Sequence, residues 1–491
     1  MLASDVLHPA LGYAGYLFLT YILRLLGYRL LLHPLRDYPG PFLAKLTGLH
    51  AGFYAVRRRL HLEIYRNHVQ YGPVVRVGPD RLVFNSVTAL HDIYQSERIT
   101  ESRGYVTTAR NNVFNVFNAL DRDLHRQKRR LVGLAVSERS MRAFEPTLMS
   151  HVDICLSQML ESSRNSSSVD MTAKARHPGL DIVGQLAFGY DLRIQTSEEN
   201  RFMMKAMTFG NYRGNVYQHL HWRSKLYPTP ILDKVFYEAR EKYYPLLETM
   251  ISTRVAQDKH AKHDLFSFVA ESVKSTDRGG DLWQEALFFI LAAGDTTATA
   301  ICAAFFYMSR NPECYKKLAS EIRSAFETGL DIKSGPQLAG CRYLRACIDE
   351  SMRMSPPVGT TLREQDSRDG ETQPLIVDGH VIPRGTLVGV NIYALHHNPE
   401  YFPDPFTFSP EPWIIPWSEG AAGEKARKLM HDAFAAFSVG TRGCAGKAMA
   451  YLGGLSGGWV LEAWLAPFQE QTRRLICILD YCSSQTCGAT I

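Results

Sequence analysis

A single cysteine in a glycine-rich loop constrains this chain more than any other feature of its sequence. The segment 437–446 reads F-S-V-G-T-R-G-C-A-G, and a run of mostly small, apolar residues follows it. Glycines permit positive φ angles and close approach of the backbone. A helix starting after the loop turns its N–H groups toward the sulfur, which favours a thiolate. Arg442 adds a cation that can hold a cofactor carboxylate. An isolated cysteine is usually a small buried hydrophobe, but this pattern indicates a ligand.

The pattern F-x-x-G-x-R-x-C-x-G resembles the haem-binding loop of the cytochrome P450 monooxygenases, and every fixed position matches. The resemblance implies that Cys444 is the axial thiolate ligand of haem iron, a ligation that favours O–O bond cleavage. It also implies the fold, which is mainly α-helical with small β-sheets and follows a single N-terminal transmembrane helix. The cofactor-binding positions that it implies in the loop are Phe437, Gly440, Arg442 and Gly446.

Length and composition favour one large domain. The chain has 491 residues, 45% of them hydrophobic, and no linker or repeat divides it. We expect a membrane anchor at 1–33, the haem-thiolate domain at 34–452 and an atypical tail at 453–491. The formal net charge of +6 is too small and diffuse to favour nucleic acid, and it suits a neighbouring anionic membrane or acidic partner. The nine cysteines are scattered, which indicates reduced thiols.

The N-terminus predicts a membrane anchor. Residues 9–32 are apolar except for Arg24 and Arg29. A span needs about 20 residues, and arginines near one end can snorkel. The basic residues 57–59 follow, so the positive-inside rule places the bulk of the chain in the cytosol. With the hinge-like Tyr38–Pro41, the resemblance implies a single-pass protein of the endoplasmic reticulum membrane. The alternative is a buried amphipathic helix.

Three further residues match positions that reach the haem propionates in the family. His125 and Arg129 match its W-x-x-x-R pattern, with His in place of Trp. Histidine can still donate a hydrogen bond, so the role can persist. Arg363 follows a proline turn and a short strand, where the resemblance implies another propionate contact. The neighbouring Arg126, Lys128 and Arg130 are expected to face outward, as a solvated face or as a docking patch for an acidic reductase.

A long apolar helix at 283–307 contains the unusual polar pair Asp295 and Thr296. Both residues lower helix propensity. The pair resembles the family's A-G-x-D/E-T pattern, which implies a locally opened helix and proton relay through water to the oxygen site. The alternative is a kink caused by hydroxyl bonding to the helix backbone.

Glu350 and Arg353 lie at i, i+3 on one helix face. The resemblance implies a buried structural pair, and the family usually supplies a second arginine where Pro412 stands. We therefore expect the pair to lack one partner, which is costly when it is buried. After Leu452 a cluster of glycines makes a poor helix, and the resemblance ends there.

The resemblance implies a haem monooxygenase that takes electrons from an NADPH-dependent reductase and inserts one oxygen atom from O2 into an apolar small molecule. The aromatic-rich region 200–230 fits a lid over such a substrate. The overall pattern resembles filamentous-fungal enzymes that tailor secondary metabolites such as terpenoids, polyketides or alkaloids. Two alternatives stay open: a haem-thiolate isomerase or peroxygenase, and a catalytically impaired relative with a divergent C-terminus.

Overall fold

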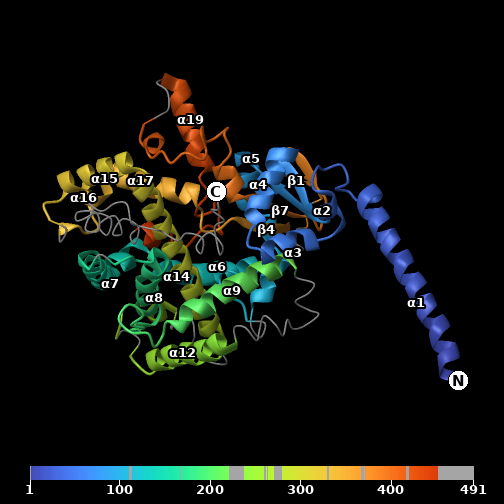
Figure 1. Cartoon of the computed structure of the whole chain (residues 1–491), viewed down its shortest axis with the longest axis horizontal. Coiled ribbons are helices and arrows are strands. Elements are labelled where there is room, and N and C mark those ends of the chain that lie inside the picture. Colours follow the sequence, from blue (N-terminus) through green and yellow to red (C-terminus); the bar gives the residue numbers. More distant parts are fainter. Residues whose placement is uncertain are drawn as a thin grey trace.

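Helices make up most of the molecule, and a five-stranded sheet lies toward one side of it (Figure 1). The structure, a computed structural model, describes residues 2–451 except 110–112, 166, 221–236, 259–260, 263, 270–278, 329–330, 367–369, 371 and 416–419. The tail predicted at 453–491 and the end of the predicted lid at 221–230 lie outside the described residues. The predicted fold class, mainly helical with small sheets, is confirmed.

The helices of the first part of the chain are α1 (Leu2–Gly27), η1 (Tyr28–Leu32), α2 (Phe42–Leu46), α3 (Leu49–Val56), α4 (Leu60–Tyr71), α5 (Val87–Tyr94), η2 (Arg103–Thr108), α6 (Arg122–Ala135), α7 (Glu138–Arg164), α8 (Met171–Phe188) and α9 (Phe202–His219). Those that follow are α12 (Tyr237–Val255), α13 (Leu265–Val269), α14 (Gly279–Arg310), α15 (Pro312–Ala325), α16 (Pro336–Ala339), α17 (Arg342–Met354), α18 (Ile392–His396), η4 (Glu411–Trp413) and α19 (Gly420–Ala433).

The larger sheet has the strand order β1-β2-β7-β4-β3. Its strands are β1 (Val74–Gly78), β2 (Arg81–Phe84), β3 (Ile99–Glu101), β4 (Thr360–Gln365) and β7 (Leu387–Asn391). Among the described strands, only β2 and β7 pair in parallel. A second pair, β5 (Leu375–Val377) and β6 (His380–Ile382), is antiparallel. The predicted hairpin around the Gly-Pro-Asp turn is confirmed as β1 and β2. Since β4 carries Arg363 and β3 borders the cavity, this sheet supplies one wall of the site.

The N-terminal helix α1 extends away from the body of the molecule (Figure 1). Two described helical segments are long and apolar enough to span a membrane: Leu11–Leu32, no part of which is buried, and Trp283–Arg310, which is half buried. The hinge-like turn that follows the first segment packs on the sheet, where Arg76 N–H donates to the Pro39 carbonyl at 2.7 Å. Gly40 is required there because a Cβ would overlap the Arg76 carbonyl oxygen.

The central helix α14 crosses α8 closely, and both helices carry site residues. At the crossing, a Cβ on Gly179 would lie 3.4 Å from the Gly294 carbonyl oxygen, so small residues allow the close approach. Polar side chains fix where the surrounding helices start, as expected of N-caps. Those that accept an N–H of the first turn are Asp121 for α6, Ser137 for α7 and Asp170 for α8.

The C-terminal end of α9 is tied to the sheet through two buried side chains. Arg81 Nη2 donates to the carbonyl oxygen of His219 at 3.0 Å, and Arg81 Nη1 lies 3.3 Å from His219 Nδ1. Burial, and then the charge of Arg81, lowers the pKa of His219 to about 3. The ring is therefore neutral near neutral pH, and α9 is held against one wall of the cavity.

Because of the lowered pKa of His219, we expect a measurable loss of protein stability in acid. Between about pH 6.5 and pH 3 the unfolded chain protonates residue 219 and the folded chain does not, so folding loses about 1.4 kcal/mol per pH unit. In His219→Gln the amide oxygen can still accept from Arg81, but nothing titrates. The thermal unfolding midpoint of both proteins is measured at about pH 7 and about pH 5. Between these values, the midpoint of the unaltered protein should fall more than that of His219→Gln. A difference independent of pH would contradict this assignment.

Candidate active site

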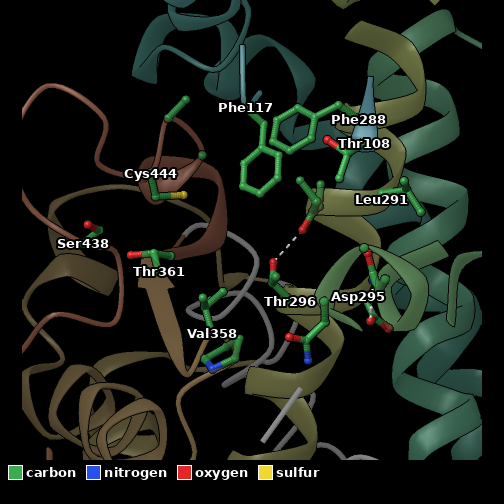
Figure 2. Close-up of a pocket in the computed structure, with 18 of the residues that line it drawn as sticks. Thr108, Phe117, Phe288, Leu291, Asp295, Thr296, Val358, Thr361, Ser438 and Cys444 are labelled. Atoms are coloured by element: carbon green, nitrogen blue, oxygen red, sulfur yellow. Dashed lines mark hydrogen bonds between the residues drawn. The ribbon is translucent and has the colours of Figure 1, made fainter. Parts of the chain in front are cut away.

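Cys444 lies in a loop whose shape is set by its own backbone (Figure 2). Its N–H donates to the Phe437 carbonyl at 2.8 Å, and the N–H of Gly443 donates to the Gly440 carbonyl at 3.0 Å. Gly440 has a φ of +76°, and a Cβ there would overlap the carbonyl oxygen of Tyr94. Only glycine satisfies both conditions. Gly440, which the resemblance implies as a cofactor-binding position, is thus required here for packing behind the loop.

The Cys444 thiol is accessible because it faces a cavity of about 640 Å³. Burial raises the pKa of this thiol, while the N–H of Gly446 and the charges of Arg129 and Lys447 lower it. The sequence predicts that the loop favours the thiolate. The donors act in that direction, but burial outweighs them. Coordination to a metal ion deprotonates a thiol outright, so this site suits a cysteine that is a ligand rather than a free nucleophile.

Nearly all of the predicted site residues meet in this one cavity, although they come from α6, α14, β4 and the cysteine loop. Gly440 is the exception and lies behind the loop against Tyr94. The predicted residues that line the cavity are His125, Arg129, Asp295, Thr296, Arg363, Phe437, Arg442, Cys444 and Gly446. The convergence of segments so far apart in sequence makes this cavity the candidate active site.

The cavity wall between Cys444 and α14 is largely apolar. Phe117 and Phe288 stack with their ring centroids 5.0 Å apart and their planes at 14°. Figure 2 shows this pair above the space that Cys444 faces, with Thr296 on the other side of it. Leu291 lines the same wall. A ligand between Cys444 and α14 therefore contacts mainly apolar side chains. The polar side chains of the cavity are confined to a few positions.

Three arginines gather at the cysteine-loop side of the cavity. Arg129 Nη1 donates to the Gly443 carbonyl at 2.5 Å. Arg442 Nη1 donates to the Ala119 carbonyl at 2.8 Å. Arg363 is fully enclosed on β4, with its guanidinium 5.1 Å from the ring centroid of Tyr94. The three cations line one cavity and are arranged around Cys444.

Glu101 joins this cluster, and sequence reasoning missed it. Its buried carboxylate forms an ion pair with Arg363, and Oε1 lies 3.9 Å from Arg442 Nη1. Burial raises the pKa of Glu101, and the two arginines oppose that shift. Among the described residues, Arg363 Nε and Glu101 Oε2 are buried without a hydrogen-bond partner. Both residues line the cavity, so hydrogen-bonding capacity remains unused in its wall.

His125 is buried beside these cations. Burial, and then the charges of Arg442, Arg129 and Arg363, lowers the pKa of this imidazole to about 3. It is therefore neutral near neutral pH and has one N–H to donate. A neutral imidazole keeps the N–H that the predicted donor role requires.

Asp295 is held in place by two side chains that sequence reasoning did not identify. Arg176 Nη2, from α8, lies 2.8 Å from Asp295 Oδ1, and Asn211 Nδ2, from α9, donates to Oδ2 at 2.9 Å. The same Arg176 nitrogen donates to Thr208 Oγ1 at 2.9 Å. The carboxylate thus joins three helices at the cavity wall. An arginine in a helix of unremarkable pattern gives no signal for this long-range pair.

The helix around Thr296 is continuous, contrary to the predicted local opening. The Thr296 hydroxyl donates to the Ala292 carbonyl at 2.7 Å (Figure 2), and the Thr299 hydroxyl donates in the same way to the Asp295 carbonyl at 2.9 Å. These are the bonds of the alternative prediction, in which hydroxyls compete for backbone acceptors. Thr296 still lines the cavity, so its hydroxyl can exchange this bond for one to a ligand or water.

The predicted gap at Pro412 is filled by its neighbour. Arg353 Nε donates to Glu350 Oε2 at 2.7 Å, and the Trp413 indole donates to the same oxygen at 3.0 Å. The backbone N–H of Ser409 donates to Oε1 at 2.8 Å. Arg353 Nη1 also donates to two backbone carbonyls. The prediction that this pair lacks a partner is therefore wrong, because a neutral donor replaces the arginine.

The basic face of α6 is only partly exposed. Arg126 and Arg130 face outward as predicted. Lys128 does not: it is buried, with Nζ 3.0 Å from Glu285 Oε1 on α14. The prediction of an exposed Lys128 is wrong because Glu285, more than 150 positions away, compensates its charge. This ion pair ties α6 to α14 next to the candidate site.

Comparisons with known proteins agree with the geometry. The sequence profile of the family Cytochrome P450 matches residues 39–453. The chain is 32% identical over 460 residues to the cytochrome P450 monooxygenase AKT7 of Alternaria alternata, an alignment that covers 91% of this chain and 87% of that protein. It is 33% identical over 453 residues to the cytochrome P450 monooxygenase poxM of Penicillium oxalicum, covering 89% and 84%. It is also 33% identical over 465 residues to apf7 of Gibberella fujikuroi, covering 87% and 84%.

Proposed function

Because the chain belongs to the cytochrome P450 family, we propose that it inserts one oxygen atom from O2 into an apolar organic substrate. The family consists of haem-thiolate monooxygenases, so the chain is an oxidoreductase whose cofactor is haem. We further propose an oxidative tailoring step in the biosynthesis of a secondary metabolite, such as a terpenoid, polyketide or alkaloid. The observation that carries the proposal is that Cys444 and Thr296 face one apolar cavity from opposite sides.

The residues around Cys444 suit haem. The thiol faces the cavity, and a Cβ on Gly446 would lie 3.9 Å from Cys444 Sγ, so the glycine there keeps the space beside the sulfur open. The unpartnered Arg363 Nε is a ready donor for a propionate. Arg129, Arg442 and the neutral His125 would hold the remaining propionate oxygens. With Glu101 offsetting one of the three arginines, the cluster is left with a charge that balances two propionates. When bound, thiolate-ligated haem supplies the activation of dioxygen.

The proposed role of Thr296 and Asp295 is to hold and move protons. Asp295 is fixed by Arg176 and Asn211, so its carboxylate stays at the edge of the cavity. The Thr296 hydroxyl, at the cavity wall, would order the last water of the relay. Release of the Ala292 carbonyl by the Thr296 hydroxyl would be the first step.

Thr296→Ala tests this relay. The variant should keep haem and its spectrum. The amount of product per NADPH consumed should fall roughly tenfold or more, because the hydroxyl no longer orders the water that delivers protons. Coupling is measured by NADPH consumption against product with an added reductase. Thr299→Ala is the matched control, since it loses the same kind of backbone bond but does not line the cavity. Equal coupling in Thr296→Ala and the unaltered protein would refute the relay.

The electron donor is proposed to be an NADPH-dependent reductase with an acidic face. The exposed Arg126 and Arg130 lie on α6, the helix whose inner face carries His125 and Arg129. A cationic patch this close to the haem pocket suits an acidic electron donor. A haem-thiolate isomerase or peroxygenase would need no such partner, so the dependence of product on added reductase separates the two functions.

The proposed location is the endoplasmic reticulum membrane, with the catalytic domain in the cytosol. No residue of the apolar segment Leu11–Leu32 is buried, as expected of a span. The proposed boundaries are an anchor at 1–33, a catalytic domain at 34–452, supported by the family match at 39–453, and a distinct tail at 453–491.

The experiment that tests the function is a carbon monoxide difference spectrum of the reduced, purified full-length protein. A Soret band at about 450 nm indicates thiolate-ligated ferrous haem. A protein without haem and without this band would refute both the monooxygenase and its isomerase or peroxygenase alternative. With the band present, reductase-dependent oxygenation of an apolar substrate completes the test.

A further inference from the structure

The candidate cavity is lined by more cations than the haem propionates require. Arg129, Arg363 and Arg442 surround the cysteine loop, whereas Arg58 and Arg213 line the cavity elsewhere. Arg58 follows α3, and its guanidinium lies 4.7 Å from the ring centroid of Tyr212 on α9. Arg213 is the next residue of α9. These two arginines therefore belong to a separate part of the cavity, where α9 meets the segment after α3.

Arg213 is half-buried and belongs to a continuous cavity-facing stripe of α9. Its guanidinium carbon lies 5.8 Å from the ring centroid of Tyr217, one turn further along the helix. Within the described part of the chain, no carboxylate forms an ion pair with it. The acidic residues that line the cavity, Glu101 and Asp295, are paired with other arginines. The charge of Arg213 is thus available to a ligand.

Two glycines flank Arg213 on the same stripe, and neither is required by packing. A Cβ on Gly210 would lie 3.7 Å from Leu291 Cδ2, and one on Gly214 would lie 3.8 Å from Thr108 Cγ2. Both are ordinary van der Waals distances, although glycine is disfavoured inside a helix. The absence of side chains at these positions keeps space open beside the guanidinium.

Arg58 has an unusual backbone conformation for its residue type, with a φ of +57°. Glycine or asparagine would occupy this left-handed position with less strain. A strained residue that lines a ligand cavity suggests a function for its side chain. Here the side chain adds a second cation to the cavity lining, against Tyr212, which precedes Arg213 on α9.

We infer that the substrate is an amphipathic organic acid, whose carboxylate binds Arg213 while its apolar chain extends between Phe117, Phe288 and Leu291 toward Cys444. Arg58 lines the same cavity, so its positive charge adds to the attraction for the carboxylate. Guanidinium groups bind carboxylates with directed, charge-assisted hydrogen bonds. Phe117 and Phe288 form an apolar wall of the cavity, so we expect the part of the substrate that approaches Cys444 to carry no charge. This inference rests on the proposed function and names the class of substrate that the site selects.

The test compares dodecanoic acid with its methyl ester on the full-length, haem-loaded protein in nonionic detergent. Affinity is read from the shift of the Soret band during titration. The protein should bind the acid roughly tenfold or more tightly than the ester, as expected for charge-assisted hydrogen bonds. Arg213→Gln should lose most of that preference and keep its affinity for the ester. Arg58→Asn, which suits the left-handed backbone, should lose part of it.

Arg201→Gln is the matched control, because this arginine also belongs to the α9 region but pairs with Glu198 and does not line the cavity. It should behave as the unaltered protein. Equal affinity for acid and ester, no binding of either, or an unchanged preference in Arg213→Gln would overturn the inference. Failure of the proposed function shows separately as a missing carbon monoxide band, and equilibrium dialysis of labelled dodecanoate against the full chain then still measures the role of Arg213.

Discussion

Replacement of Cys444 by serine is expected to abolish the Soret band at about 450 nm and all oxygenation. A serine hydroxyl is a hard, weakly acidic ligand, whereas iron in this setting requires the electron density of a thiolate. The loop itself should survive, because its shape depends on backbone bonds from Cys444 to Phe437 and from Gly443 to Gly440. The variant should therefore lose the iron ligand but keep the fold. It is measured by the carbon monoxide spectrum together with circular dichroism.

Cys302→Ser provides the comparison. This cysteine is fully buried between α8 and α14, and its thiol lies 3.5 Å from the Met171 carbonyl oxygen. Serine there can keep a bond to that carbonyl and does not touch the cavity, so the band and the activity should persist. Retention of the band in Cys444→Ser, or its loss in both variants, would contradict the assignment of Cys444 as the ligand.

Local patterns in the sequence predict much of this site. The cysteine loop, the acid–threonine pair and the short hairpin of β1 and β2 each depend on residues close together in the chain, and each lies where expected. The fold class follows from the same resemblance. Such features can be predicted because glycine, proline and other turn residues restrict the conformation of the residues next to them.

The parts that could not be predicted are pairs formed across the fold. Glu101 meets Arg363 and Arg442, and Arg176 meets Asp295, only because strands and helices far apart in sequence pack together. A lone charged residue in an ordinary strand or helix carries no signal of its partner.

Two of the three wrong predictions share this cause. Lys128 is predicted to be exposed because its neighbours are basic, yet it is buried and its charge is compensated by Glu285. The open helix at Thr296 is a property of the family pattern, whereas here the helix is continuous and the hydroxyl adds a bond to the Ala292 carbonyl one turn earlier. The gap at Pro412 is judged from one position, but Trp413 places an indole donor on the same carboxylate. For Lys128 and Pro412, a contact across the fold overrides an inference from neighbouring residues.

The second large effect is expected at Arg353. Its side chain is 2% exposed and that of Glu350 is 4% exposed, so Arg353→Met leaves a buried carboxylate without its cation. Removing one partner of a buried pair costs about 3–5 kcal/mol, a large share of a typical stability of roughly 5–15 kcal/mol. The network also joins α17 to the segment before the cysteine loop, through the carbonyls of Pro405 and Thr407. We therefore expect a severalfold loss of haem-loaded protein and a much lower unfolding temperature.

Two further variants grade this effect. Trp413→Phe removes a single donor to Glu350 and should cost only about 1–3 kcal/mol. Arg345→Met is the control on the same helix: Arg345 pairs with Asp349 at 2.9 Å, but its side chain is 44% exposed. Asp349 is buried, but it keeps a hydrogen bond from the Tyr451 hydroxyl at 2.7 Å, so we expect the loss of the half-exposed Arg345 to cost the least of the three. If Arg353→Met and Arg345→Met destabilise the protein equally, burial does not decide the strength of the pair. A graded order, with Trp413→Phe between the two, would mean that the indole has taken over the structural role of the missing arginine.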